Sequence, residues 1–183
     1  MAKYKDITDF LNMGNVKKYD IIYADPPWKF NDRTPQKVLS SSTQYKTMDL
    51  NNLMNLPISK ITSGSILFLW VPTSMMFEGI EVMNHWGFKY KTKLYWVKTG
   101  KLGTGYYFRN QIEELWVGIQ QGVKPFHLPI RNYIEKASLG HSIKPLEFID
   151  LINKVAEKIN KHNKIELFAR TCNEGWDCVG LEV

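Results

Sequence analysis

At 183 residues the chain is long enough to bury about 70% of its unfolded surface, and because no linker rich in Pro, Gly or Ser divides it, we expect one domain over residues 1–183. Its hydrophobic content of 44% and charged content of 23% are typical of a soluble globular protein. No apolar stretch approaches the roughly 20 residues of a membrane-spanning helix, and the first residues contain no signal-peptide core. The sequence therefore excludes a membrane protein and predicts a cytoplasmic one. The net charge of +6 favours a polyanionic partner such as nucleic acid.

Five short apolar runs predict buried strands. They are rich in Ile, Val and aromatic residues, and they are mostly continuous rather than alternating, which is the pattern of a sheet covered on both faces. In chain order the runs are Tyr19–Ala24, Ser65–Val71, Lys93–Val97, Leu115–Ile119 and Ile165–Ala169.

Two helical patterns lie between these strands. The first runs from Ser74 to Trp86 and ends before Gly87, a natural helix stop. The second runs from Pro145 to His162. Strands that alternate with helices predict an α/β fold, a Rossmann-like three-layer sandwich with a largely parallel central sheet. The apolar stripes consist of Phe77, Ile80, Met83 and Trp86 in the first helix and of Phe148, Ile152, Val155 and Ile159 in the second.

Three segments, 29–46, 99–111 and 120–142, fit neither strand nor helix, and loops of this length are usually functional or disordered. They interleave cations with aromatic residues, as a rim that binds nucleic acid requires; solvated loops anchored by packed aromatics are the alternative. The cations are Lys29, Arg33, Lys37, Lys46, Lys101, Arg109, Lys124 and Arg131, and the aromatics are Phe30, Tyr45, Tyr106, Tyr107 and Phe108. We expect substrate contacts from Lys29, Arg33, Tyr45 and Arg109.

The first predicted strand runs directly into Asp25-Pro26-Pro27-Trp28. Ligands of open α/β sheets bind at the carboxyl ends of strands. The two prolines fix the backbone and leave carbonyls that only accept hydrogen bonds, a carboxylate adds acceptor capacity, and an aromatic plane follows. This arrangement suits a planar group with an NH2, such as adenine stacked on Trp28. A structural turn that ends a strand is the alternative.

The chemistry of adenine explains why such a site is needed. The N6 lone pair is delocalised into the ring, so the amine is a poor nucleophile. We expect Asp25 and the Pro26 carbonyl to hold its two hydrogens and to aim a pyramidal nitrogen at a methyl sulfonium, by orientation and electrostatic preorganisation. We expect no metal: a sulfonium methyl is already activated, and Cys172 and Cys178 complete no zinc site. We interpret both cysteines as reduced thiols.

The chain resembles the MT-A70 family of adenine-N6 methyltransferases over nearly all of its length. The matching blocks follow the order of the family. They are ADPPW (24–28), QYKTM (44–48), ILFLWV (66–71), HWGFKYKTKLYWVKTG (85–100), GTGYYFRNQIEELWVG (103–118), HSIKP (141–145), IELFAR (165–170) and GWDCVGLEV (175–183). The resemblance implies a class I methyltransferase-like fold with permuted motif order, S-adenosylmethionine as cofactor and adenine in nucleic acid as methyl acceptor.

The resemblance also implies roles for single positions. Asp25 to Trp28 match the catalytic motif. Lys144 matches a lysine that binds the methionine carboxylate of the cofactor, and as the residue that opens a helix it would lie where an anion is attracted; a solvated lysine is the alternative. For Asp6, capping of a helix is the alternative to cofactor binding. The other implied cofactor contacts are Ile7, Asp25, Phe168, Arg170, Asn173 and Glu182.

Three positions depart from the family pattern. Gln44 replaces a common His, Ile143 a common Arg, and Leu181 an Asn whose loss removes a hydrogen bond to the cofactor ribose. None of them alters the catalytic motif or Lys144, so we expect an active enzyme, either a monomer or a homodimer. DNA is expected more than RNA, because the compact chain resembles the stand-alone bacterial and phage members. The alternatives are a catalytically silent partner subunit that binds nucleic acid, and transfer to cytosine N4 or a protein amide.

Overall fold

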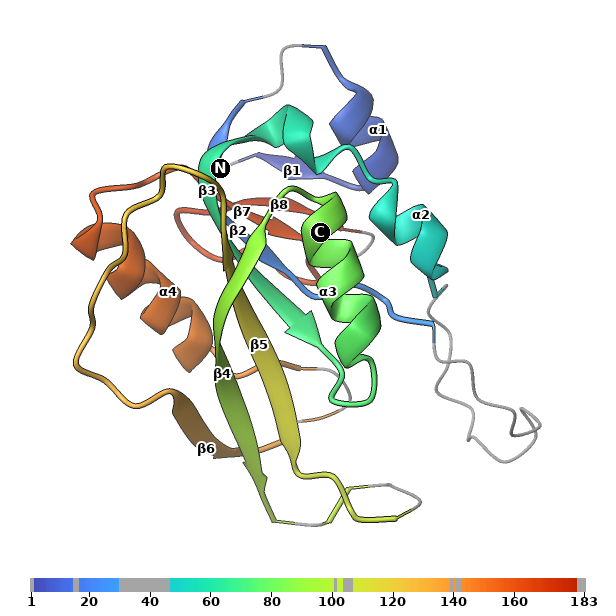
Figure 1. Ribbon diagram of the computed structural model, residues 1–183, viewed down its shortest axis with the longest axis vertical. Coiled ribbons are helices and arrows are strands. Elements are labelled where there is room, and N and C mark those ends of the chain that lie inside the picture. Colours follow the sequence, from blue (N-terminus) through green and yellow to red (C-terminus); the bar gives the residue numbers. More distant parts are fainter. Residues whose placement is uncertain are drawn as a thin grey trace.

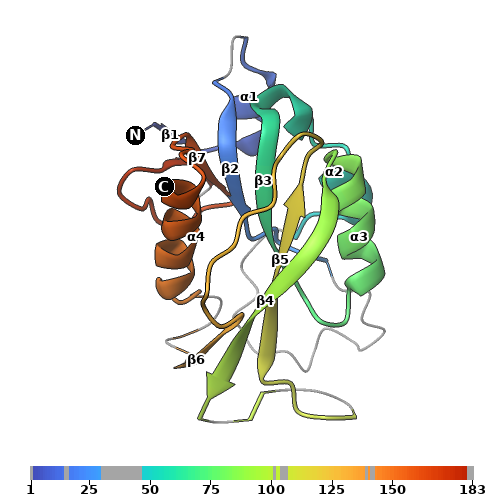
Figure 2. The same ribbon diagram turned by 60° about the vertical axis from the view of Figure 1, so that its left-hand side comes forward.

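The computed structural model describes residues 2–14, 17–29, 47–100, 102–103, 107–138, 140 and 143–180. In this part of the chain an eight-stranded sheet separates helices on its two faces (Figures 1 and 2), with the strand order β1-β8-β7-β2-β3-β5-β4-β6. The strands are β1 (Lys3–Tyr4), β2 (Tyr19–Ala24), β3 (Thr62–Val71), β4 (Lys89–Thr99), β5 (Ile112–Ile119), β6 (Tyr133–Ala137), β7 (Lys164–Leu167) and β8 (Asp177–Val179).

The sheet is largely parallel, as predicted. Among the described strands β5 alone runs against its neighbours, since it pairs antiparallel with both β3 and β4. The remaining pairs, β1 with β8, β8 with β7, β7 with β2, β2 with β3 and β4 with β6, are parallel. Parallel strands point their carboxyl ends to the same edge of a sheet, so this topology gathers the segments after β2, β3 and β7 at one edge. The predicted Rossmann-like α/β fold is confirmed.

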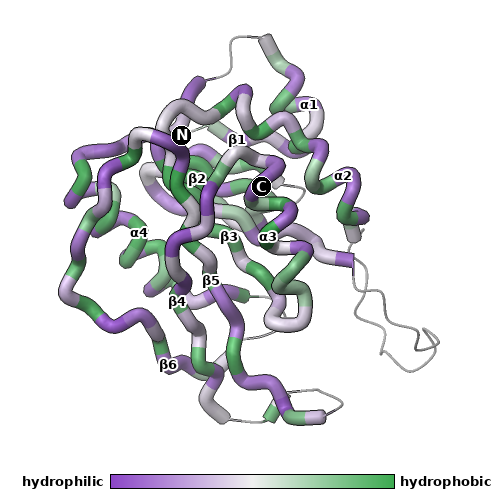
Figure 3. Tube along the Cα trace, in the orientation of Figure 1, coloured by the Kyte–Doolittle hydropathy of each residue, from purple (hydrophilic) through white to green (hydrophobic). Residues whose placement is uncertain are grey.

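Alternate side chains of the central strands pack into two cores on opposite faces. In β3, Leu67 and Leu69 face the core that includes α3 (Met76–His85), α1 (Ile7–Asn12) and α2 (Leu50–Met54). Phe68 and Trp70 face the core under α4 (Glu147–Lys158). This period of two is that of a strand buried on both faces, and Figure 3 shows the hydrophobic stretches along the central strands. A 3-10 helix, Ile58–Ile61, leads into β3.

Both predicted helices form, and the apolar stripe predicted for the first is wrong at one position. Helix α3 ends at His85, and Gly87, two residues later, has a φ of +80° that favours glycine. Phe77, in the first turn, is 76% exposed, and the buried face consists of Gly79, Val82 and Met83. A Cβ on Gly79 would lie 2.6 Å from a methyl group of Val71, so α3 packs closely on β3. Helix α4 buries its predicted stripe at Phe148, Ile152 and Val155.

Other elements were not predicted. The segment 120–142, for which no regular structure was expected, contains the edge strand β6, which pairs with the outer side of β4. Cys172 and Cys178 form a disulfide across a Cα–Cα distance of 5.8 Å, so the prediction of reduced thiols is wrong. No helix in the described ranges is long and apolar enough to cross a membrane.

Candidate active site

A pocket of about 1760 Å³ opens at the carboxyl edge of the sheet. Its volume exceeds the roughly 300–1,000 Å³ of an ordinary small-molecule site, so it has room for two ligands side by side. The topology brings its walls together, because the carboxyl ends of the parallel strands and the start of the antiparallel β5 meet at one edge of the sheet. The lining segments include 5–8, 25–28 after β2, 70–74 at the end of β3, 98–100 at the end of β4, Asn110, Ile112 and Glu113 at the start of β5, Lys144 before α4, 168–170 after β7 and 179–180 at the end of β8.

The segment Asp25–Trp28 forms a tight turn at the end of β2. The backbone N–H of Trp28 donates to the Pro26 carbonyl at 2.9 Å, and the N–H of Met48 donates to the Pro27 carbonyl at 2.9 Å. A carbonyl oxygen has two lone pairs, so the Pro26 carbonyl, which accepts from its own turn, can accept one more hydrogen. The prolines cannot rotate about φ. The turn therefore holds acceptors at a fixed place on the pocket wall.

Trp28 is part of the core and not an open stacking surface. Only 7% of the residue is exposed, and its indole N–H donates to the Trp70 carbonyl at 2.9 Å. The ring is buried among the residues of the α3 core, although Trp28 also lines the pocket. The tryptophan therefore anchors the turn to the end of β3, and the stacking of adenine on its ring stays a prediction.

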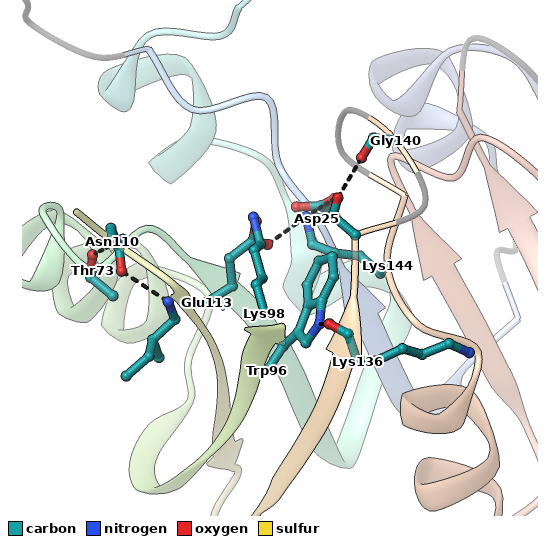
Figure 4. A network of polar contacts seen from close by, with 11 residues as sticks. Asp25, Thr73, Trp96, Lys98, Asn110, Glu113, Lys136, Gly140 and Lys144 are labelled. Carbon is teal, nitrogen blue, oxygen red and sulfur yellow. Dashed lines mark hydrogen bonds and ion pairs between the residues drawn. The ribbon is translucent and has the colours of Figure 1, made fainter. Parts of the chain in front are cut away.

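Four charged side chains meet in the pocket (Figure 4). The Nζ of Lys144 lies 2.8 Å from Oδ2 of Asp25 and 3.3 Å from Oε2 of Glu113, and Lys98 forms a second ion pair with Glu113. The Lys144 side chain is 14% exposed, and its ammonium lies 5.0 Å from the centre of the Trp70 ring, a cation–π distance. Asp25 and Lys144 are predicted site residues, whereas Glu113 and Lys98 were not predicted from the sequence.

Opposite charges in this network shift the pKa of their neighbours and stabilise the charged forms. Burial lowers the pKa of Lys144, but Asp25 and Glu113 raise it by more, so the pKa lies above its ordinary value. Burial raises the pKa of Glu113, but Lys144 and Lys98 together lower it by more, so the pKa lies below its ordinary value. Both groups are therefore charged at neutral pH. Lys144 lies three residues before the first residue of α4, Glu147, and does not open the helix.

A third carboxylate, Glu166 of β7, is coupled to this network through the charge of Asp25. Its pKa is raised to about 7, mainly by burial, against a hydrogen bond from Asn173 that lowers it and together with the charge of Asp25, which also raises it. The Asn173 amide donates to Oε2 of Glu166 at 2.8 Å. Asn173, which was expected to contact the cofactor, thus holds the side chain of Glu166 and is absent from the residues that line the pocket.

The far end of the pocket is formed by residues near the N-terminus and near the C-terminus of the chain. Asp6 caps α1, since its Oδ1 accepts from the backbone N–H of Thr8 at 2.8 Å, and it lines the pocket together with Ile7. Phe168 adopts a φ of +62°, which is rare for a non-glycine residue. A Cβ on Gly180 would lie 1.9 Å from the Ala169 carbonyl, so only glycine allows this close approach.

The family model described as MT-A70 matches residues 19–182. The chain belongs to the MT-A70 family. The type II methyltransferase M.MunI of Mycoplasma sp. is 35% identical over 91% of this chain and 78% of its own length. The putative N(6)-adenosine-methyltransferase MT-A70-like of Medicago truncatula is 29% identical over 97% of this chain. The human N(6)-adenosine-methyltransferase catalytic subunit METTL3 is 27% identical over 95% of it. The chain spans only 28% and 30% of these last two proteins.

Membership of the MT-A70 family, a family of adenine-N6 methyltransferases, raises the question of whether the pocket fits S-adenosylmethionine. The amino-acid end of this molecule carries one carboxylate and one ammonium. The pocket offers a cation, Lys144, between two carboxylates, Asp25 and Glu113. Its far end, at Ile7 and Phe168, is apolar enough for an adenine ring. The residues present therefore fit the group in charge and in chemical character.

The other predicted site residues lie at the rim or outside the described residues. Phe168 and Arg170 line the pocket, whereas Lys29 and Arg109 are exposed beyond it. Arg33, Tyr45 and Glu182 lie outside the described residues, as do Gln44 and Leu181. Of the described residues, no three His, Cys, Asp or Glu side chains form a group that could hold a metal ion.

Proposed function

We propose that the chain transfers a methyl group from S-adenosylmethionine to the N6 amine of adenine in nucleic acid, with DNA favoured over RNA. One observation carries the proposal: Asp25 of the DPPW turn and Lys144 lie 2.8 Å apart in one large pocket at the carboxyl edge of the sheet. The membership of the MT-A70 family supports the same chemistry. S-adenosylmethionine, when bound, supplies a methyl group already activated by a sulfonium.

The zwitterionic end of the cofactor can replace the internal partners of the network. Lys144 would hold the methionine carboxylate, and a carboxylate of the pocket would hold the ammonium, so that each charge keeps an opposite charge beside it. Ile7, Phe168 and Arg170, which line the pocket, would hold the adenosine end. Because charged partners are exchanged and not merely added, burial of the cofactor leaves no charge of this network unpaired.

The DPPW turn positions the acceptor amine. Oδ2 of Asp25 faces a positive charge, Lys144 in the free protein and the cofactor ammonium after the exchange. Oδ1 is then left to accept one N6 hydrogen, and the second lone pair of the Pro26 carbonyl would accept the other. Two acceptors on a rigid turn hold the nitrogen lone pair toward the methyl group, and this orientation is the main contribution of the chain to the rate. The proton leaves after transfer, to Asp25 or to water.

The proposal for the acceptor rests on charge and size. A net charge of +6 attracts a phosphate backbone, and the pocket volume allows an extruded base beside the cofactor. DNA is favoured because the relative matched over most of its own length is a type II methyltransferase, whereas the adenosine methyltransferases are several times longer than the matched region.

Product analysis tests the proposal. The protein is incubated with methyl-labelled S-adenosylmethionine and matched DNA and RNA oligonucleotides, single- and double-stranded, and the digested nucleosides are identified by mass spectrometry. We expect labelled N6-methyladenine, mainly from DNA, and none with the Asp25→Asn variant. Binding of nucleic acid without measurable binding of the cofactor would instead identify a silent partner subunit, and label on cytosine would refute the assignment of the acceptor.

A further inference from the structure

The tip of the β4–β5 hairpin carries aromatic side chains that are almost wholly in solvent. Tyr107 is 95% exposed and Phe108 89% exposed, and the neighbouring Arg109 is exposed as well. Leu102, on the other arm of the loop, is also exposed. Single exposed apolar residues are ordinary on protein surfaces, but adjacent exposed aromatics beside a cation are typical of a surface that binds a partner.

The tip is attached to the mouth of the pocket. The amide of Asn110 donates to the Thr73 hydroxyl at 2.9 Å, which ties the loop to the segment after β3 (Figure 4), and its oxygen accepts from the N–H of Ile112 at 2.9 Å. A Cβ on Gly103 would lie 2.1 Å from the Asn110 carbonyl, so the two arms of the loop touch there. Thr73, Gly103 and Asn110 all line the pocket. The aromatic residues are therefore next to the entrance and not on a remote surface.

We propose that Tyr107 and Phe108 stack on the nucleotides that flank the target adenine, while Arg109 binds an adjacent phosphate. The inference rests on the proposed function, because it requires that a base enters the pocket. Extruding a base removes the stacking partner of its neighbours, at a cost of a few kcal/mol. Aromatic rings at the entrance can replace that lost stacking for any flanking base, since every base has a π face.

Charge favours nucleic acid over a second protein as the occupant. Arg109 follows the two aromatics directly, the chain carries a net charge of +6, and Glu113, the lining carboxylate of β5, is already paired with Lys98 and Lys144. The ligand class that fits is a single-stranded or locally opened nucleic acid, with stacking that does not depend on the flanking sequence.

The test is a double-mutant cycle between the protein and its substrate. The Tyr107→Ala and Phe108→Ala variants are assayed on an oligonucleotide with one target adenine and on the same oligonucleotide with abasic sugars beside that adenine. Phe77→Ala, which removes a ring exposed on α3 outside the pocket lining, is the control. We expect KM for the intact oligonucleotide to rise about tenfold per lost stack in the Tyr107 and Phe108 variants. The KM of Phe77→Ala and the Kd of the cofactor in all three variants should change little.

The cycle has a distinct outcome for each assumption. Wild-type protein should lose about tenfold for each flanking base that is removed. A variant should lose little more when the base removed is the one that its missing ring contacts, because one stack cannot be lost twice. Additive losses, or an equal loss in Phe77→Ala, overturn the inference. A wild-type dimer that the Tyr107 or Phe108 variants convert to monomers also overturns it, since the tip is then a protein interface. Absence of methylation by the wild type refutes the proposed function itself.

Discussion

Replacing Lys144 by methionine removes the central charge of the pocket while keeping a side chain of similar length. In the structure this ammonium contacts Asp25 at 2.8 Å and Glu113 at 3.3 Å, with only 14% of its side chain exposed. Lys144→Met leaves two neighbouring carboxylates that share no cation, although Lys98 still pairs with Glu113. We therefore expect a loss of both stability and cofactor binding.

The size of the stability loss follows from geometry. At an effective dielectric constant of about 20, opposite charges 2.8 Å apart attract by about 6 kcal/mol. Most of this attraction compensates for the desolvation of the charges, and removing one partner of a buried pair costs about 3–5 kcal/mol in net terms. Because Asp25 and Glu113 keep partial access to water, we expect about 2–4 kcal/mol, which lowers Tm by about 5–15 °C in a chain of this size.

Thermal unfolding with and without S-adenosylmethionine measures both losses. The Kd of the cofactor should rise about 10- to 100-fold, the cost of one charged hydrogen bond. The control is Lys136→Met, which breaks a pair with Glu147 at 2.5 Å on the surface and should cost less than about 1 kcal/mol. A Lys144→Met protein with the Tm and cofactor affinity of the wild type would refute the reasoning from this network.

The pH dependence gives an independent check. The pKa of Glu113 is lowered in the folded state by Lys144 and Lys98 against an opposing effect of burial. A lowered carboxyl pKa stabilises the fold above the unfolded value, here 4.5, and this contribution is lost as the pH falls through the folded value. The deficit of Lys144→Met relative to the wild type should thus be largest near neutral pH and shrink below about pH 4.5.

Three further substitutions test other parts of the site. Asp25→Asn should lower kcat by about 10²–10³-fold, with Tm changed by only a few degrees. The pKa of Glu166 is raised to about 7, so the wild type loses stability as the pH rises from 4.5 to 7. Glu166→Gln should therefore stabilise the protein by about 3 kcal/mol at pH 8 and by much less at pH 5, as measured by urea unfolding. Gly180→Ala should lower Tm and raise the Kd of the cofactor about tenfold or more, because its Cβ would displace the Ala169 carbonyl.

The central strands could be predicted from the sequence because burial on both faces leaves a local signature. Each of the five predicted runs overlaps a strand, and β2 has the predicted bounds of Tyr19–Ala24. The edge strand β6 has the sequence YIEKA and an exposed, polar pattern, so its stability depends on pairing with β4, some 40 residues away in the chain. No local pattern records such a pairing.

Glu113 illustrates why the site could be predicted only in part. Two adjacent glutamates begin β5, and successive strand residues point to opposite faces. Glu113 reaches Lys144, whereas Glu114 accepts from Lys93 and from the indole of Trp116 on the other face. The register of β5 with its neighbours decides which glutamate faces the pocket, and this register is a property of the whole sheet.

The residues of the DPPW turn differ in their surroundings more than the motif predicts. Asp25 and Pro26 both line the pocket, and the Pro26 carbonyl accepts from the N–H of Trp28 within the turn. Trp28, in contrast, is buried, and its indole N–H is bound to the Trp70 carbonyl. A rigid turn positions acceptors only if it is itself held in place, and here the end of β3 holds it through the tryptophan. The residue interpreted as a stacking surface therefore acts as an anchor, and the exposed rings next to the pocket lie on the β4–β5 hairpin.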